Sequence, residues 1–225
     1  MRAGAAVNGW SWRAAVVSIC AAVAGLTAYG IGRWAWLDEV DVAAHRWAPE
    51  FPRRIPFVLA QLGFDLGDAR GLTWVGLSLA AFAAWRLRRW YPLMVYIMVW
   101  VFHTALIQVL KVWASRGQPD TEQPLLGGIA GGTSFPSGHS ASAVVYFALA
   151  GALLAALTGD RRWNGRMAAV AAVVTTLCAA SIFYLGYHWV SDVVAGTAIG
   201  IAEWVLLGPI ARRLLRVERP TEALT

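Results

Sequence analysis

The sequence predicts an all-α, polytopic membrane protein with six transmembrane helices and both termini in the cytoplasm. Three observations predict this fold class. First, 58% of the 225 residues are hydrophobic and only 14% are charged, whereas soluble domains contain about 45–50% apolar and about 25% charged residues. Second, the apolar residues form runs long enough to cross a bilayer as helices. Third, the basic residues fall in short clusters between these runs, as topology signals do. We expect one domain covering residues 1–225.

Six charge-poor stretches predict the transmembrane helices, because a helix needs about 20 mostly apolar residues to cross the hydrocarbon core. The second stretch is short, and we expect it to gain a turn at each end. The sixth contains one acid, Glu203. A further apolar segment, 55–64, is too short to span, and its Pro56 and charged flanks favour an interfacial or re-entrant helix over a loop. The predicted spans are 14–32, 71–85, 90–110, 140–159, 167–187 and 193–211.

The charge distribution predicts the orientation. When the six spans alternate, 12 basic residues and only three acids fall on one side of the membrane. The positive-inside rule makes this side cytoplasmic. The other side receives seven basic residues with nine acids, together with the longest connections, 33–70 and 111–139.

The charge and cysteine content exclude other classes of partner. The net charge is +6, but the basic residues do not follow one polar face, so no nucleic-acid partner is expected. Cys20 and Cys178 lie inside apolar runs and are predicted to be buried small side chains rather than a disulfide or a metal pair. There is no D-x-D or H-E-x-x-H motif, and neither a metal nor another cofactor is expected.

The first of three polar clusters follows the third span on the outer side. It consists of Lys111, Arg116, Gln118 and Pro119. Lys111 is the only lysine among 19 basic residues, so a compact, flexible ammonium group stands here in a chain that otherwise uses arginine. The alternative is an ordinary lysine at a helix end whose ammonium group extends to the membrane surface.

The second cluster, 131–139, runs directly into the fourth span and ends in Ser137-Gly138-His139. Glycines, a hydroxyl and a helix N-terminus together form an anion-binding turn, because unpaired backbone N–H groups and the positive end of the helix dipole face the ligand. The alternative is a simple turn in which Ser137 caps the helix. His139 favours the binding site, since neither capping nor membrane entry requires an imidazole.

The third cluster, 184–192, joins the fifth and sixth spans and contains His188 and Asp192. If this segment is helical, the spacing of four places both side chains on one face, where the carboxylate fixes the imidazole tautomer and leaves the other ring nitrogen as a nucleophile. The alternative is an interfacial histidine within an aromatic belt. The presence of all three clusters on the outer side favours a catalytic site.

These motifs resemble those of the type 2 phosphatidic acid phosphatase family, within the vanadium-haloperoxidase-like superfamily: K-x6-R-P, P-S-G-H and S-R-x5-H-x3-D. The middle motif is complete at 136–139, and the third matches at Ser181, His188 and Asp192. The resemblance covers about 55–211. Gln118 and Ile182 stand where the family has arginines that hold phosphate. Arg116 is the residue expected to replace the first of them.

The resemblance implies a membrane lipid phosphatase in which His188 attacks phosphorus, Asp192 orients the ring and His139 protonates the leaving oxygen. The implied phosphohistidine is then hydrolysed by water without a cofactor. The implied location is the inner (plasma) membrane, with the site on its extracytoplasmic face. Substrate-binding residues would be Lys111, Arg116, Gln118, Ser137 and Gly138.

The resemblance leaves the lipid open. A prenyl diphosphate carrier and a glycerolipid such as phosphatidate or phosphatidylglycerophosphate are the leading candidates, with a slight preference for the prenyl carrier. The missing arginines permit an alternative function, namely a phosphatase-like protein that binds or moves a lipid phosphate without cleaving it. A structural scaffold ranks last, because it gives no reason for polar residues to gather at three span ends.

Overall fold

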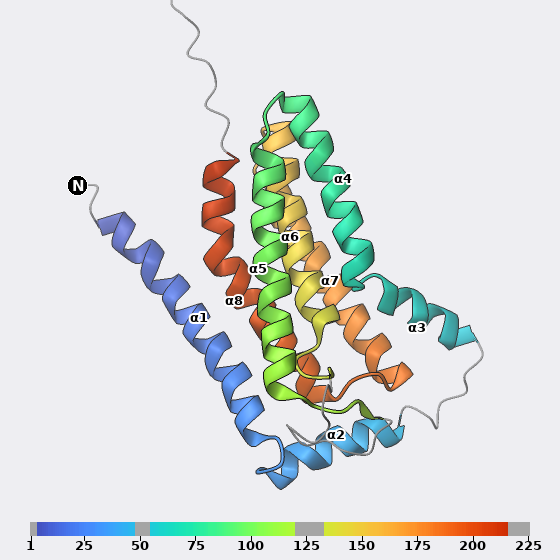
Figure 1. Ribbon diagram of the computed structural model, residues 1–225. Coiled ribbons are helices and arrows are strands. Elements are labelled where there is room, and N and C mark those ends of the chain that lie inside the picture. The colour runs from blue at the N-terminus through green and yellow to red at the C-terminus, as the bar shows by residue number, and fades with distance from the viewer. Residues whose placement is uncertain (1–3, 48–54, 120–132, 216–225) are drawn as a thin grey trace, which may run out of the picture.

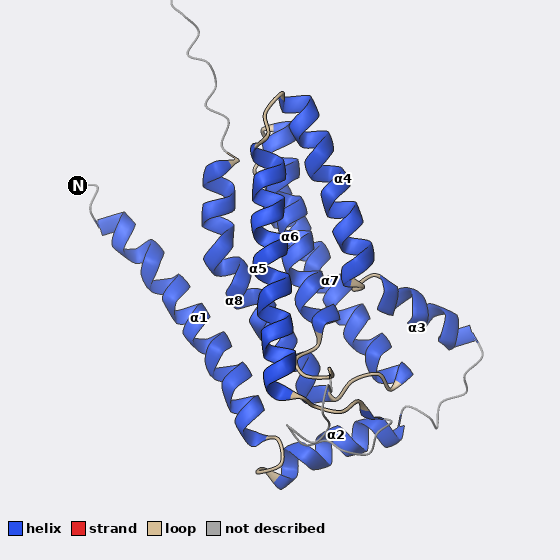
Figure 2. Cartoon of the chain, viewed as in Figure 1, coloured by secondary structure: helices blue, strands red, loops and turns tan. Residues whose placement is uncertain are grey.

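The computed structural model describes residues 4–47, 55–119 and 133–215. All regular secondary structure in these segments is helical, which confirms the predicted class (Figures 1 and 2). Some residues used in the sequence analysis lie outside these segments. They are the charged residues at 2, 50–54, 120–122 and 216–222, which contributed to the predicted orientation, and the glycines at 131 and 132. The eight helices are α1 (Gly4–Gly30), α2 (Ala35–Trp47), α3 (Ile55–Asp65), α4 (Ala69–Leu87), α5 (Tyr91–Ala114), α6 (Gly138–Thr158), α7 (Arg162–Leu185) and α8 (Val190–Leu214).

Among the described residues, five helices are long and apolar enough to cross a membrane: α1, α5, α6, α7 and α8. The chain is therefore a multi-pass membrane protein. The remaining predicted span corresponds to α4, which has 19 residues and carries arginines near both ends. α4 packs against α5 and α6 and runs along the bundle (Figure 1). Its membrane crossing, and the cytoplasmic location of the termini, stay predictions.

α6 lies at the centre of the bundle and packs against α4, α7 and α8, while α1 covers α8 (Figure 1). Consecutive long helices run in opposite directions, so α5 ends where α6 and α8 begin. The main apolar core includes Tyr96 of α5, Tyr146 and Leu149 of α6, and Ala211 of α8. This arrangement brings the ends of three helices together at one end of the bundle.

Two glycines allow α8 to approach the start of α6 closely. A Cβ atom on Gly196 would lie 2.3 Å from the backbone oxygen of Ser137, and one on Gly200 would lie 2.8 Å from that of Ala141. Small residues at such spacing let the backbones of membrane helices pack closely. In this packing the Ser137 N–H donates to the Asp192 carbonyl at 3.0 Å.

Two short helices lie in the long connection between α1 and α4. The short helix expected at 55–64 is present as α3, at Ile55–Asp65. α2 was not expected, and it lies across the end of the bundle (Figure 1). It exposes Trp36 and Val40 and buries Leu37 and Asp41, the pattern of an amphipathic helix at a membrane surface. Its run of acids made the segment resemble a polar loop in sequence.

Candidate active site

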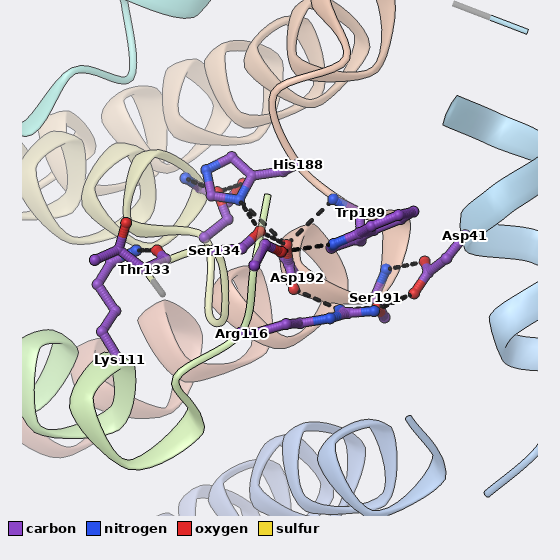
Figure 3. A network of polar contacts seen from close by, with 12 residues as sticks. Asp41, Lys111, Arg116, Thr133, Ser134, His188, Trp189, Ser191 and Asp192 are labelled. Atoms are coloured by element: carbon purple, nitrogen blue, oxygen red, sulfur yellow. Dashed lines mark hydrogen bonds and ion pairs between the residues drawn. The ribbon is translucent and has the colours of Figure 1, made fainter. Parts of the chain in front are cut away.

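The three polar clusters meet at the end of the bundle where α5 ends and α6 and α8 begin. Lys111 lies in the last turn of α5, His139 in the first turn of α6 and Asp192 in the first turn of α8. His188 precedes α8 by two residues. The helical segment expected at 188–192 therefore begins only at residue 190, but the two side chains meet nonetheless (Figure 3).

His188 is oriented by a carboxylate and a hydroxyl. Its Nδ1 lies 3.3 Å from Asp192 Oδ2 and 3.3 Å from Ser134 Oγ. Ser134 Oγ also donates a short hydrogen bond to Asp192 Oδ2, so its oxygen is able to accept from the imidazole. Because a carboxylate only accepts hydrogen bonds, this geometry assigns the ring proton to Nδ1 and leaves the lone pair on Nε2.

The second imidazole faces the first. The ring centroids of His139 and His188 are 6.4 Å apart, with the ring planes at 63° to each other, so the two imidazoles are neighbours. His139 stacks on Phe64 with centroids 4.0 Å apart. Its Nε2 is buried, makes no hydrogen bond among the described residues and lies 4.0 Å from Asp68 Oδ1. His139 is therefore held mainly by its stacking on Phe64.

Asp192 is held from its far side by a buried ion-pair network (Figure 3). Arg116 Nη1 donates to Asp192 Oδ1 and to Ser191 Oγ, both at 2.6 Å, and its Nη2 donates to Asp41 Oδ2 at 2.8 Å. The side chains of Arg116, Asp41 and Asp192 are each 0% exposed. The guanidinium also lies over the Trp189 ring, 5.3 Å from its centroid. Arg116 thus binds two carboxylates in this structure.

Asp192 also fixes the start of α8. Its Oδ2 accepts from the Trp189 backbone N–H at 3.2 Å, which closes a capping arrangement at the helix N-terminus. The Trp189 indole N–H donates to the Gly117 carbonyl at 2.9 Å. These bonds tie the loop after α5 to the segment that carries His188.

Lys111 and the turn before α6 form the other wall of the site. Lys111 Nζ donates a short hydrogen bond to the Thr133 carbonyl, next to Ser134. A Cβ on Gly138 would lie 3.7 Å from Lys111 Cε, so the Lys111 side chain lies close to the start of α6. Ser137 caps α6, as the simpler alternative proposed, by accepting from the Ser140 N–H at 3.5 Å.

The two positions that depart from the family motifs differ in environment. Gln118 is exposed, whereas Ile182 is fully buried in an apolar cluster with Cys178 and Val193. The isoleucine side chain has no hydrogen-bond donor, so it cannot replace the arginine of the family motif. The observed burial of Cys178 agrees with its prediction as a small apolar side chain.

A further polar cluster, separate from the three at the candidate site, lies deeper in the bundle. His103 Nδ1 lies 2.8 Å from Glu203 Oε2, and His103 Nε2 lies 2.9 Å from Ser142 Oγ. The side chains of His103 and Glu203 are 4% and 0% exposed. These residues come from α5, α6 and α8, the helices that carry Lys111, His139 and Asp192.

The sequence profile described as PAP2 superfamily matches residues 92–213, more than half of the chain. This chain belongs to the PAP2 superfamily. Phosphatidylglycerophosphatase B of Bacillus subtilis (strain 168) is 34% identical over 123 residues, which are 53% of this chain and 59% of that relative. The match thus spans less than two thirds of the relative's length.

A solved structure shares the fold. It is the crystal structure of the first transmembrane PAP2 type phosphatidylglycerolphosphate phosphatase from Bacillus subtilis, with a TM-score of 0.72 and 22% sequence identity. The alignment covers 92% of this chain and 98% of that structure. The PAP2 fold therefore extends well beyond the matched profile to most of this chain.

Several residues around the candidate site were not foreseen from sequence. Asp41 and Phe64 lie in the connection before the matched region, Ser134 lies two residues before the P-S-G-H motif, and Ser191 directly precedes Asp192. The spacing of the PAP2 motifs gives no signal for Asp41, whose pairing with Arg116 spans 75 positions. Ser134 was part of the expected glycine-rich turn, but its contact with His188 was not predicted.

Proposed function

We propose that this chain is a membrane lipid phosphatase that works through a phosphohistidine on His188. The observation that carries the proposal is the pairing of His188 Nδ1 with Asp192 and Ser134, because it leaves Nε2 as the nucleophile. In this proposal the neighbouring His139 ring, whose centroid is 6.4 Å from that of His188, acts on the other side of the same phosphate.

In the proposed reaction, His188 Nε2 forms a bond to phosphorus while the bond from phosphorus to the lipid oxygen breaks. His139, in its protonated form, gives a proton to the departing oxygen. A water molecule then attacks the phosphohistidine, His139 accepts a proton from that water, and inorganic phosphate leaves with His188 restored. The proton that His139 gives to the lipid oxygen in the first step is thus replaced by the proton it takes from water in the second.

Charge on the phosphate would be balanced by groups at the start of α6 and the end of α5. Lys111 supplies an ammonium group, and the backbone N–H groups of Gly138 and His139 lie at the positive end of the α6 dipole. In this proposal Gln118 contributes an exposed amide, while Ser137 mainly shapes the turn. The reaction as written draws on these groups rather than on a metal ion.

The proposed substrates share a terminal phosphate and an apolar tail: a prenyl diphosphate, phosphatidate or phosphatidylglycerophosphate. The name of the Bacillus subtilis relative makes phosphatidylglycerophosphate the first lipid to test. We further propose that 1–225 forms one domain and that the site faces the extracytoplasmic side of the plasma membrane, since the predicted outer loops carry most of its residues.

The test is phosphate release by purified protein from a panel of these lipids in detergent, with His188→Ala as the matched control. We expect release from at least one lipid by the parent and none by His188→Ala. Activity of His188→Ala equal to that of the parent would refute the proposed nucleophile.

A second candidate function is binding of a lipid phosphate without hydrolysis. Two observations favour it: Ile182 is buried among apolar residues, and Arg116 is engaged by two carboxylates. Each missing charge-assisted contact weakens phosphate binding by about 1.5–3 kcal/mol. Saturable binding of a panel lipid by a parent that releases no phosphate would support this candidate over the first.

A further inference from the structure

Asp41 is a fully buried carboxylate carried by a helix outside the matched family region. It belongs to α2, whereas the family match begins at residue 92. Asp41 is 0% exposed, whereas Glu39 on the same helix is exposed. A buried carboxylate is strongly destabilising unless it is paired and hydrogen-bonded, so its partners indicate why it is there.

Both oxygens of Asp41 are used, and both bind the elements that hold Asp192. Oδ1 accepts from the Ser191 backbone N–H at 2.9 Å, and Oδ2 accepts from Ser191 Oγ at 2.5 Å. Oδ2 also accepts from Arg116 Nη2 at 2.8 Å. Figure 3 shows Asp41 on one side of Arg116 and Asp192 on the other. Asp41 thereby fixes the guanidinium that binds Asp192, which in turn binds His188.

The formal charges of this cluster give Asp41 a second effect. Arg116 and Asp192 alone sum to zero, and Asp41 brings the buried cluster to −1. When His188 attacks phosphorus, its imidazole gains positive charge. A net negative cluster beside it, with little exposure to solvent, stabilises that charge more than a neutral cluster would.

We propose that Asp41 is a positioning residue for the hydrolysis, acting on Asp192 and His188 through Arg116. This inference rests on the proposed function. It assigns to α2 a part in the reaction that acts through Arg116 and needs no contact between α2 and the substrate. Ser191 bonds both Asp41 and Arg116. The same geometry therefore gives it a positioning role with a smaller effect.

The experiment compares Asp41→Asn with Glu39→Gln, which removes one negative charge from the exposed face of the same helix. Turnover is measured per active site, with active sites counted from the burst of phosphoenzyme. For Asp41→Asn we expect kcat to fall about tenfold or more while KM changes by less than about threefold. Glu39→Gln is expected to match the parent in both. Asp41→Glu, which restores the charge, is expected to recover part of the lost kcat.

A merely structural role gives a different result. It would lower the number of active sites or the melting temperature but leave kcat per site equal to that of the parent, and that outcome would overturn the proposal. If Asp41→Asn does not fold, Ser191→Ala decides the question, because it removes one hydroxyl and keeps the backbone donor to Asp41. We expect a severalfold loss of kcat at unchanged KM, and unchanged kcat would overturn the proposal.

Failure of this inference is distinguishable from failure of the proposed function. A parent that hydrolyses none of the panel lipids contradicts the proposed function itself. A parent that is active, with His188→Ala inactive and Asp41→Asn as active as the parent, leaves the phosphatase intact and removes Asp41 from its mechanism.

Discussion

Arg116 and Asp192 are joined by a 2.6 Å ion pair in which neither side chain is exposed to solvent. Arg116 therefore points to the carboxylate behind His188, although its place in the sequence, two residues before Gln118, suggested a phosphate contact. To reach phosphate it would have to leave two buried carboxylates, which is strongly unfavourable. The geometry supports a role in holding Asp192.

The first prediction follows from this pairing. Arg116→Lys keeps the charge but removes the planar fork that serves Asp192 and Asp41 together. We expect phosphate release to fall roughly tenfold or more, as when a charge-assisted contact of about 1.5–3 kcal/mol is lost. Gln118→Arg, added to this variant, should not restore activity, because an exposed arginine cannot replace a buried one.

The matched control for Arg116→Lys is Arg70→Lys, whose side chain is 92% exposed, and it should behave like the parent. Rescue of Arg116→Lys by Gln118→Arg would contradict the positioning role and return Arg116 to the phosphate. Turnover of the parent, of the single variants Arg116→Lys and Arg70→Lys, and of the double variant measures all of these outcomes.

The second prediction separates the two histidines by their chemistry. His188→Ala removes the nucleophile and should abolish turnover on every substrate. His139→Ala removes the proton donor, so it should still form a phosphoenzyme from an aryl phosphate, whose leaving group needs little protonation. The measurement is protein-bound phosphate after rapid quenching in base, because the P–N bond of a phosphohistidine survives base and is hydrolysed in acid. Equal residual activity of both variants on the aryl phosphate would contradict the assignment of His188.

The third prediction concerns the buried pair His103 and Glu203, which lies 2.8 Å apart inside the bundle. Loss of His103 leaves the buried Glu203 carboxylate without its imidazole partner, and loss of Glu203 leaves His103 with only its contact to Ser142. Breaking a buried pair in this way destabilises a protein by about 3–5 kcal/mol. His103→Leu and Glu203→Leu should each lower the melting temperature, and the double variant should be more stable than the sum of the two losses predicts. Additive losses, measured by thermal unfolding in detergent, would show that the pair is not coupled.

The sequence was sufficient for those parts of the fold that depend on hydropathy alone. Charge-poor runs located the long helices, because crossing a bilayer requires an apolar stretch of fixed length. Helix ends were less predictable, since α5 continues through Lys111 to Ala114, and a long side chain at a helix end is able to extend its charge out of the apolar region. α2 was missed because three acids in one helical segment resemble a solvated loop when the buried partner of Asp41 is not known.

Residues of the candidate site were predictable where they belong to motifs with a fixed spacing. Contacts between segments that are distant in sequence were not predictable. His139, His188 and Asp192 follow from local spacing and helix termini. The partner of Arg116 does not, because the sequence gives no signal of whether a guanidinium faces a phosphate or a carboxylate contributed by a distant segment. The stacking of Phe64 on His139 likewise depends on how α3 packs against α7.

The last prediction concerns the close approach of α8 to the start of α6. Alanine normally stabilises a helix relative to glycine by about 1 kcal/mol, so Gly196→Ala would be expected to stabilise α8 if packing did not matter. A Cβ at this position, however, would lie 2.3 Å from the Ser137 carbonyl oxygen. The oxygen belongs to the backbone and the Cβ is bonded directly to it, so neither atom can rotate away. α8 and the turn before α6 must therefore separate, which lengthens the 3.0 Å bond from Ser137 N–H to the Asp192 carbonyl.

We accordingly expect Gly196→Ala to lower the melting temperature and to reduce phosphate release about tenfold or more, because near-ångström displacements of reacting groups have large effects on rate. Gly25→Ala is the control, since a Cβ there meets nothing within 4 Å; it should be neutral or stabilising and should leave activity unchanged. Melting temperature and turnover of both variants, measured in the same detergent, test the argument. If Gly196→Ala is stabilised like Gly25→Ala and remains fully active, helix propensity outweighs the contact, and the close packing of α8 on the Ser137 turn does not position His139 relative to Asp192.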